Sequence, residues 1–188
     1  MSTPKEELQR RIDKQLADEP EDKKIKLKKF ANDLTSGVLP KDAMGLSDDY
    51  IEGMYAFGYR LYTTGKYEQA AQVFRMLVML NPSDARFLLG LAACYHMKKD
   101  YENAANTYML CIVLTPKDPI PYYHVSDCFI ELEDYPMATK SLQLCLYHAG
   151  KGGEEYNTIR NRAEVSLEAL KERLGAEMPK EATHGNKS

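Results

Sequence analysis

Four cysteines at equal spacing are the first residues of this 188-residue chain whose chemistry has to be decided. Cys94, Cys111, Cys128 and Cys145 each lie 17 residues from the next. Thiols can ligate zinc, but structural zinc sites use close pairs of the C-x-x-C type, and none of the four forms such a pair. An equal spacing instead puts each thiol at a recurring packing position, where a small, soft side chain fits. We therefore expect four buried structural thiols and no metal site.

The other reactive residue types form no catalytic pattern. There is no glycine-rich phosphate loop, and His124, His148 and His184 share no set of partners typical of a triad. The net charge is −3, without the basic stripe that phosphate neutralisation needs, which argues against nucleic acid as a partner. The sequence predicts no catalytic residue and no cofactor, so we expect a binding protein rather than an enzyme.

The hydropathy pattern argues against membrane insertion and export. The N-terminal residues are polar and lack the apolar stretch of a secretory signal. The longest apolar runs, such as residues 88–95, are too short to cross a bilayer. We expect a soluble protein of the cytoplasm.

The elements that position these residues follow a period of 34. Three copies, 51–84, 85–118 and 119–152, follow one another without insertion. The recurring small and turn residues are Gly58, Ala92 and Ser126, then Ala70, Ala104 and Ala138, then Pro82, Pro116 and Gly150. A period of this length predicts an all-α helix–turn–helix solenoid, whose concave face holds another polypeptide.

Proline and glycine place the helices inside each repeat. Pro82 and Pro116 end the second helices of two repeats, because proline cannot continue a helix. The expected helical hairpins pair 48–63 with 67–80, 84–98 with 101–114, and 118–132 with 135–148. The expected domains are a helical extension over 1–46, the repeats over 47–152, a capping helix over 153–174 and a disordered tail over 175–188.

Two helices are expected in the extension. Leu8, Ile12 and Leu16 recur every four residues in the first, which has only a narrow apolar stripe. In the second, over 21–36, the apolar stripe contains Leu27, Phe30, Ala31 and Leu34. Its spacing leaves two interpretations open: the stripe packs on the first repeat, or it meets a second copy of the chain.

The repeats resemble the tetratricopeptide repeat, because the small residues fall where its paired helices approach each other. Local sequence narrows the resemblance. Two stretches carry this narrower resemblance: the run Gly65-Lys66-Tyr67-Glu68-Gln69-Ala70 and the stretch from Ala85 to Cys94. The second stretch has Arg-Phe followed by Leu-Gly-Leu and by two small residues and a cysteine. With three repeats, an N-terminal extension of about fifty residues and a C-terminal helix, residues 30–150 are similar to class II chaperones of bacterial type III secretion.

This resemblance implies a function and partners. The implied protein is a non-enzymatic chaperone of the bacterial cytoplasm that keeps hydrophobic translocator proteins soluble and unassembled before export. Members of the family bind an extended client segment of the type Pro-x-Leu-x-x-Pro in the concave groove. Many dimerise through their N-terminal helices, which here implies a homodimer through Leu27, Phe30 and Leu34.

In such repeats the first helix of each pair lines the groove. Its groove side here is mostly aromatic or aliphatic, where residues that face water should be polar. The expected client-binding residues are Tyr55, Tyr59, Tyr62, Leu89, Ala93, His96, Tyr123 and Asp127. Tyrosine offers a large contact area with few rotatable side-chain bonds, and a carboxylate can accept a hydrogen bond from an amide of the client. The competing interpretation is that the tyrosines pack on a terminal helix and Asp127 bonds a neighbouring repeat.

Two further binding roles stay open. An adaptor for acidic C-terminal tails needs a groove clamp of Lys, Asn and Arg, but Tyr55, Tyr59 and Leu89 stand there, and residues 34–150 hold nine Lys/Arg against thirteen Asp/Glu. A general scaffold for a folded partner would tolerate polar substitution at Tyr55 and Tyr59, whereas a translocator chaperone should not.

Overall fold

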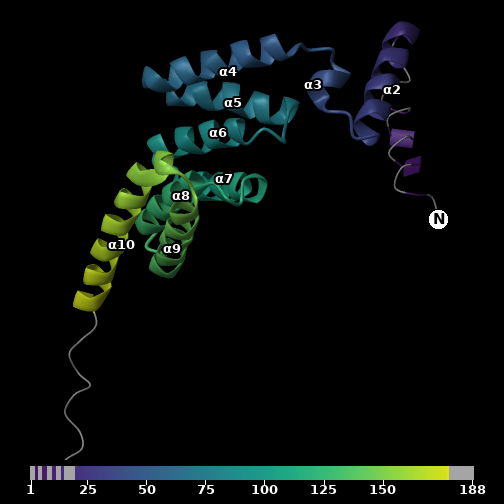
Figure 1. Ribbon diagram of the computed structural model, residues 1–188. Coiled ribbons are helices and arrows are strands. Elements are labelled where there is room, and N and C mark those ends of the chain that lie inside the picture. The colour runs from purple at the N-terminus through teal and green to yellow at the C-terminus, as the bar shows by residue number, and fades with distance from the viewer. Residues whose placement is uncertain (1–2, 4–5, 8–9, 12–13, 15–19, 178–188) are drawn as a thin grey trace, which may run out of the picture.

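The computed structural model describes residues 3, 6–7, 10–11, 14 and 20–177, and this part of the chain is all-α (Figure 1). The elements are α2 (Glu21–Thr35), α3 (Pro40–Ala43), α4 (Asp48–Thr63), α5 (Tyr67–Leu80), α6 (Ala85–Met97), α7 (Tyr101–Leu114), α8 (Pro119–Glu131), α9 (Tyr135–Lys151), a 3-10 turn η1 (Glu154–Tyr156) and α10 (Asn157–Glu177). The helix expected around Leu8, Ile12 and Leu16 lies outside the described residues.

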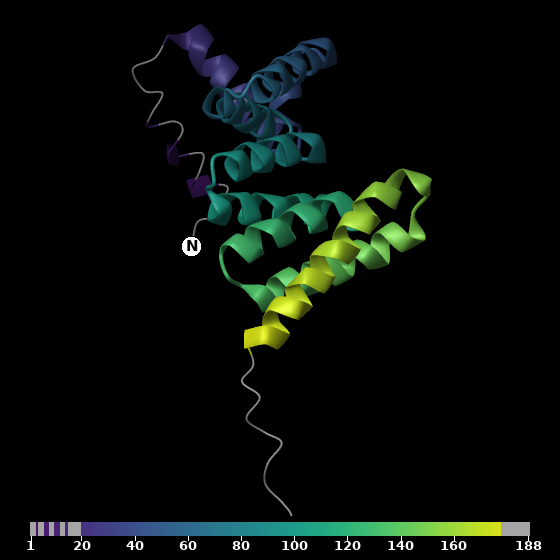
Figure 2. The same cartoon turned by 90° about the vertical axis from the view of Figure 1, so that its left-hand side faces the viewer.

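Helices α4 to α10 form one stack, in which each helix packs mainly on its neighbours along the chain (Figures 1 and 2). The expected hairpins are α4–α5, α6–α7 and α8–α9. The prediction of an all-α solenoid is confirmed. Helix α9 runs to Lys151 rather than to 148, because Ala149 is buried and this repeat has Gly150 where the other two have proline.

The turn inside each hairpin needs one residue in the left-handed region. Gly65, Lys99 and Glu133 stand at equivalent positions with φ of 77°, 60° and 59°. Only glycine adopts this conformation without a steric penalty. Aspartates at the next residue, Asp100 and Asp134, then cap the second helices of the later repeats by accepting backbone N–H groups. The backbone strain of this repeated turn is therefore smallest in the first repeat, where glycine occupies the left-handed position.

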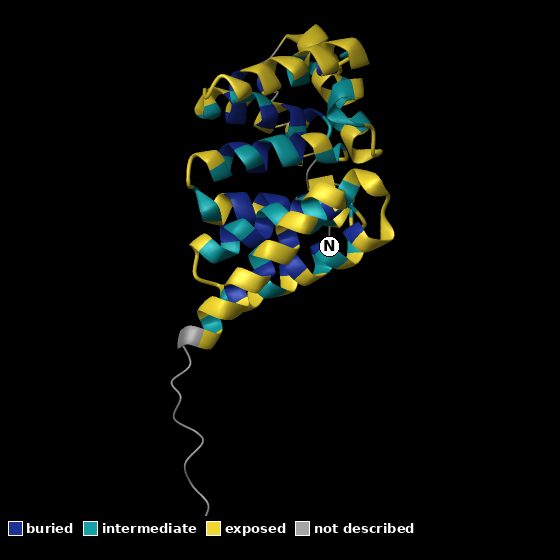
Figure 3. Cartoon of the chain, turned by 60° about the vertical axis from the view of Figure 1, so that its left-hand side comes forward, coloured by how far each residue is buried: buried dark blue, intermediate teal, exposed yellow. Residues whose placement is uncertain are grey.

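The core runs along the stack between the helices, as the burial colours show (Figure 3). A Cβ at Gly90 would lie 2.6 Å from Cε1 of the buried Phe74, so glycine lets α6 approach α5 closely. The four cysteines are all free and buried, at 0 to 2% exposure. Burial raises the pKa of Cys94, among others, to about 12. The prediction of structural thiols is confirmed.

At the C-terminal end, α10 packs on α9 and α8 (Figure 2). Ala163, Leu167 and Leu170 form its buried side. The capping helix expected over 153–174 differs at both ends, since η1 precedes α10 and α10 continues through Gly175 to Glu177. The expected tail was therefore wrong at residues 175–177, because a single glycine weakens a helix by only about 1 kcal/mol and does not stop it. Residues 178–188 lie outside the described part.

The N-terminal end of the stack is open. Tyr50 and Phe57 on the outer side of α4 are 54% and 45% exposed. The positions equivalent to Phe57 in the next two repeats are Leu91 and Val125, and both are buried between repeats. In the described part of the chain, Phe57 therefore occupies a packing position that no preceding repeat fills. We call this surface of α4 the open end.

Helix α2 stands beside the stack and packs mainly on α3 (Figure 1). None of its residues is buried; Leu27 and Leu34 are each 37% exposed and Phe30 is half-buried. Within the described residues the stripe is therefore only partly covered, and its packing on the first repeat or on a second copy stays a prediction.

Candidate functional site

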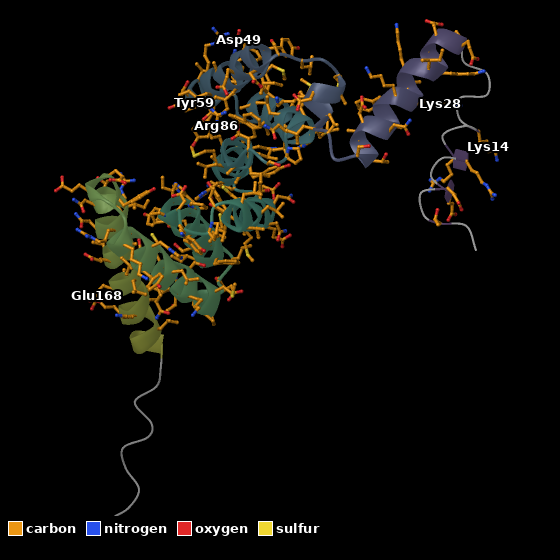
Figure 4. The ribbon with its side chains drawn as sticks, turned by 45° about the vertical axis from the view of Figure 1, so that its right-hand side comes forward. Lys14, Lys28, Asp49, Tyr59, Arg86 and Glu168 are labelled. Carbon is orange, nitrogen blue, oxygen red and sulfur yellow. The ribbon has the colours of Figure 1, made fainter. Side chains whose placement is uncertain are left out.

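A cavity of about 440 Å³ opens on the inner side of the first helices of the three repeats. All eight residues expected to bind a client line it, namely Tyr55, Tyr59, Tyr62, Leu89, Ala93, His96, Tyr123 and Asp127. We call this cavity the groove. Figure 4 shows the labelled side chains of Tyr59 and Arg86 on the same side of the stack. The helical period brings these residues together because α4, α6 and α8 repeat the same orientation.

One half of the groove is aromatic. The Tyr55 ring lies 6.0 Å from Phe74 and 5.8 Å from Phe87, between centroids. Tyr62 meets Tyr67 edge-on at 5.5 Å, whereas Tyr59 is 56% exposed. Tyr55 and Tyr62 are thus held by packing, and Tyr59 presents a free ring to the solvent. Such a surface offers pre-positioned apolar contact area to a ligand.

Arg86 is an ionic link at the edge of the aromatic half. Its guanidinium donates to both carboxylate oxygens of Glu52, at 3.2 and 2.7 Å, and to those of Asp84. It also lies 5.1 Å above the centroid of the Tyr55 ring. Hydrogen bonds to Asp84 and Glu52 raise the pKa of Arg86 further above its usual range. Because two carboxylates already neutralise it, Arg86 joins α4 to α6 and supports Tyr55 rather than offering a free charge.

The other half of the groove is polar at its base. His124 stacks on Tyr108 with centroids 5.6 Å apart and planes 19° from parallel, and it meets His96 edge-on at 6.4 Å. Asp127 Oδ2 lies 4.0 Å from His124 Nδ1. Arg162, from α10, lines the same cavity. The groove therefore joins an aromatic half on α4 to a polar half formed by α6, α7, α8 and α10.

Burial shifts the protonation of this polar half. It lowers the pKa of His124 to about 4, and His96 adds to the effect. It raises the pKa of Asp127 to about 6, and the negative charge of Glu131 acts in the same direction. Near pH 7 the groove therefore contains a neutral imidazole beside a carboxylate that is mostly ionised.

Several lining residues were not expected. Phe74 and Tyr108 come from second helices, whereas first helices were expected to line the groove, and Arg162 comes from the capping helix. Arg86 comes from the groove side of a first helix, as expected, but was not among the expected client-binding residues. His124 lies three residues before Asp127, so the helical spacing alone could have paired them. No sequence signal pointed to Arg162.

Other kinds of site find no support in the described part of the chain. Its His, Cys, Asp and Glu residues form no group of three or more that could hold a metal ion. Among the same residues, no helix is both long and apolar enough to cross a membrane.

Several known proteins are similar to this chain. The tetratricopeptide repeat family matches residues 55–119. A crystal structure of PcrH, of Pseudomonas aeruginosa, in complex with the chaperone binding region of PopD is 32% identical, with a TM-score of 0.67, over 69% of this chain and 96% of that chain. The type III secretion translocator chaperone SycD of Yersinia enterocolitica is 32% identical, with a TM-score of 0.66, over 71% and 90%.

A shorter match links the chain to a curated relative. The low calcium response locus protein H of Yersinia pestis is 45% identical over 49 residues, which are 26% of this chain. The match spans 29% of that relative, less than a third of its length. The two structures with the chaperones PcrH and SycD, by contrast, are covered almost completely.

Proposed function

The chain belongs to the family of type III secretion translocator chaperones, and on this premise we propose that it binds hydrophobic translocator proteins through an extended client segment in the groove. By covering that segment in the bacterial cytoplasm it keeps the client soluble and unassembled before export. The role is non-enzymatic, because the groove offers contact surface and hydrogen-bonding groups rather than a nucleophile with its base.

The single observation that carries this proposal is the open aromatic half of the groove. Tyr55 and Tyr62 are fixed by ring contacts while Tyr59 is 56% exposed. Large apolar side chains on an open concave surface are typical of a site that another molecule covers. A structure of SycD contains a peptide of the translocator YopD, which supports a client of the same class here.

We further propose that the chain forms a homodimer through the stripe of Leu27, Phe30 and Leu34. The exposure of Leu27 and Leu34 supports this, as does the weak packing of α2 on the rest of the chain. A second copy would cover a stripe that a single chain leaves in water.

The test of the client proposal is co-expression of the full chain with a translocator from its own bacterium. The readout is the soluble fraction of the translocator and its co-purification with the tagged chain. We expect the soluble complex with the wild type and its loss with the double variant Tyr55→Ala/Tyr59→Ala. Tyr147→Ala is the matched control, because Tyr147 is 55% exposed on α9 and does not line the groove.

Two results would contradict the proposal. A translocator that stays insoluble with the folded wild type would remove the function. A complex that survives the double variant would move the client away from Tyr55 and Tyr59. Recovery of a soluble folded partner in place of a translocator would favour the general adaptor or scaffold.

A further inference from the structure

Asp127 places a carboxylate on the groove at a position where the other two repeats have no charged side chain. It occupies the position equivalent to Tyr59 in the first repeat and to Ala93 in the second. Two repeats thus present an aromatic ring and a small apolar residue, and the third presents a carboxylate. All three side chains line the same cavity. The chemistry of the groove therefore changes from one end to the other.

The carboxylate of Asp127 is poorly compensated by the protein. Its side chain is only 30% exposed, and its nearest basic atom is His124 Nδ1, at 4.0 Å. Within the described residues, no lysine or arginine nitrogen lies within 4.0 Å of it. A half-buried carboxylate without a close cation costs free energy unless a ligand supplies one.

The groups that face Asp127 come from four helices. His96 on α6, Tyr108 on α7 and His124 on α8 are uncharged near pH 7, whereas Glu131 on α8 is an acid. Among the described residues, Arg162 on α10 is the one cation lining this cavity besides Arg86, which Asp84 and Glu52 neutralise. Arg162 is exposed, so water screens its attraction for Asp127. The neighbourhood remains favourable to one further positive charge.

We propose that the Asp127 end of the groove binds a lysine or arginine side chain of the client, while the Tyr55–Ala93 half binds the client's apolar anchors. This inference rests on the proposed function and names the client chemistry that the groove selects. Helices pack about 8–10 Å apart and an extended chain advances about 3.3 Å per residue. One to two helix spacings, about 8–20 Å, should therefore place the client cation about two to six residues before or after its last apolar anchor.

The raised pKa of Asp127 supplies a second readout. Near pH 7.5 the carboxylate is ionised and attracts the cation, whereas near pH 5 most of it is protonated. Binding of a cationic client should weaken over this interval, because the partner charge is lost. Binding of an uncharged analogue should not follow the same titration.

The experiment uses fluorescent synthetic peptides from the chaperone binding region of PopD, with lysine or the uncharged, similarly long norleucine placed at each position in turn. Affinities for the full chain are measured by fluorescence anisotropy at pH 7.5 and pH 5. We expect one or two neighbouring positions at which lysine binds about tenfold more tightly than norleucine at pH 7.5. This preference should be lost at pH 5.

Three variants identify the carboxylate responsible. Asp127→Asn should remove the lysine preference, so that lysine and norleucine peptides bind with similar affinity. Arg162→Gln should increase the preference, since it removes a competing cation. Glu102→Gln makes the same charge change as Asp127→Asn on the exposed surface of α7, outside the groove, and should change nothing.

The outcomes separate this inference from the proposed function. Tight binding of the peptides without a lysine preference, or with one that Asp127→Asn leaves intact, would overturn the cation site and keep the chaperone role. If a peptide with glutamine at the preferred position binds as tightly as the lysine peptide, Asp127 accepts a hydrogen bond from an amide. That result would also overturn the cation site. Failure of the folded wild type to bind any of the peptides would remove the proposed function and this inference together.

Discussion

His124 and Asp127 should give the free energy of unfolding two pH dependences of opposite sign. Burial and His96 lower the pKa of His124 from 6.5 to about 4, so between pH 7 and 5 only the unfolded chain takes up its proton, and stability falls as the pH drops. Burial and Glu131 raise the pKa of Asp127 from 3.8 to about 6. Over the same interval only the folded protein takes up that proton, so stability rises as the pH drops.

In the wild type these two contributions partly cancel. From pH 7 to pH 5 the full shifts correspond to a loss of about 2 kcal/mol from His124 and a gain of about 1 kcal/mol from Asp127. The side chains are 35% and 30% exposed, and solvent screening should reduce both contributions by roughly half. The wild type should therefore lose about 0.5 kcal/mol over this interval.

Single substitutions should separate the two contributions. Asp127→Asn should lose about 1 kcal/mol of stability between pH 7 and pH 5, and His124→Gln should gain about 0.5 kcal/mol over the same interval. The assay is urea unfolding followed by far-UV circular dichroism at several pH values. His124→Gln also removes a stacking contact with Tyr108, which lowers stability at every pH, so the slope rather than the offset is compared. Parallel slopes for all three proteins would refute the reasoning.

Three further predictions concern packing, the ionic link and assembly. Gly90→Ala should lower the free energy of unfolding by about 1–3 kcal/mol, because its Cβ would meet Phe74. Gly53→Ala, with open space around its Cβ, should raise the free energy of unfolding by about 0.5–1 kcal/mol. Equal unfolding midpoints in urea for the two variants would contradict this difference in packing. Arg86→Lys cannot keep both bidentate pairs, so its affinity for the PopD peptides should fall several-fold in the anisotropy assay while its circular dichroism spectrum stays unchanged; an unchanged affinity would mean that Arg86 does not support the groove. Leu27→Glu should convert the proposed dimer to a monomer in sedimentation velocity, and a monomeric wild type would remove the dimer proposal.

The fold could be predicted because its determinants are local and repeated. Pro82 and Pro116 mark where two second helices end, and Ser47 marks where the first repeat begins by capping α4. Where such a marker was missing the prediction was wrong: Gly150 does not stop α9 as a proline would, and Gly175 does not stop α10. Glycine lowers helix stability without removing a backbone donor, so its effect depends on the packing around it.

The groove was predictable only where one helix orientation repeats. Tyr55, Leu89 and Tyr123 could be assigned to one surface from their spacing alone. Arg162 could not, because it reaches the groove from a helix that lies outside the period and crosses α8. The protonation of His124 was also inaccessible, since it depends on burial between α7 and α8 rather than on sequence neighbours.

The open end has a consequence for the order in which the molecule loosens. In a linear array each unit is held only by its neighbours, so an end unit has fewer contacts than an interior one. Helix α10 gives the third repeat a second neighbour, whereas Phe57 marks the side of α4 that the described residues leave exposed. Fraying should therefore begin at α4, and its amide protons should exchange with deuterium before those of α8.

That end unit is also the one that carries Tyr55, Tyr59 and Tyr62. A ligand that touches these tyrosines and Leu89 bridges the first two units of the array, as Arg86 and Glu52 already do on one edge. Occupation of the groove would thus stiffen the least protected part of the chain. In a chaperone built in this way, the bound client would supply the first repeat with contacts that a neighbouring repeat supplies elsewhere in the array.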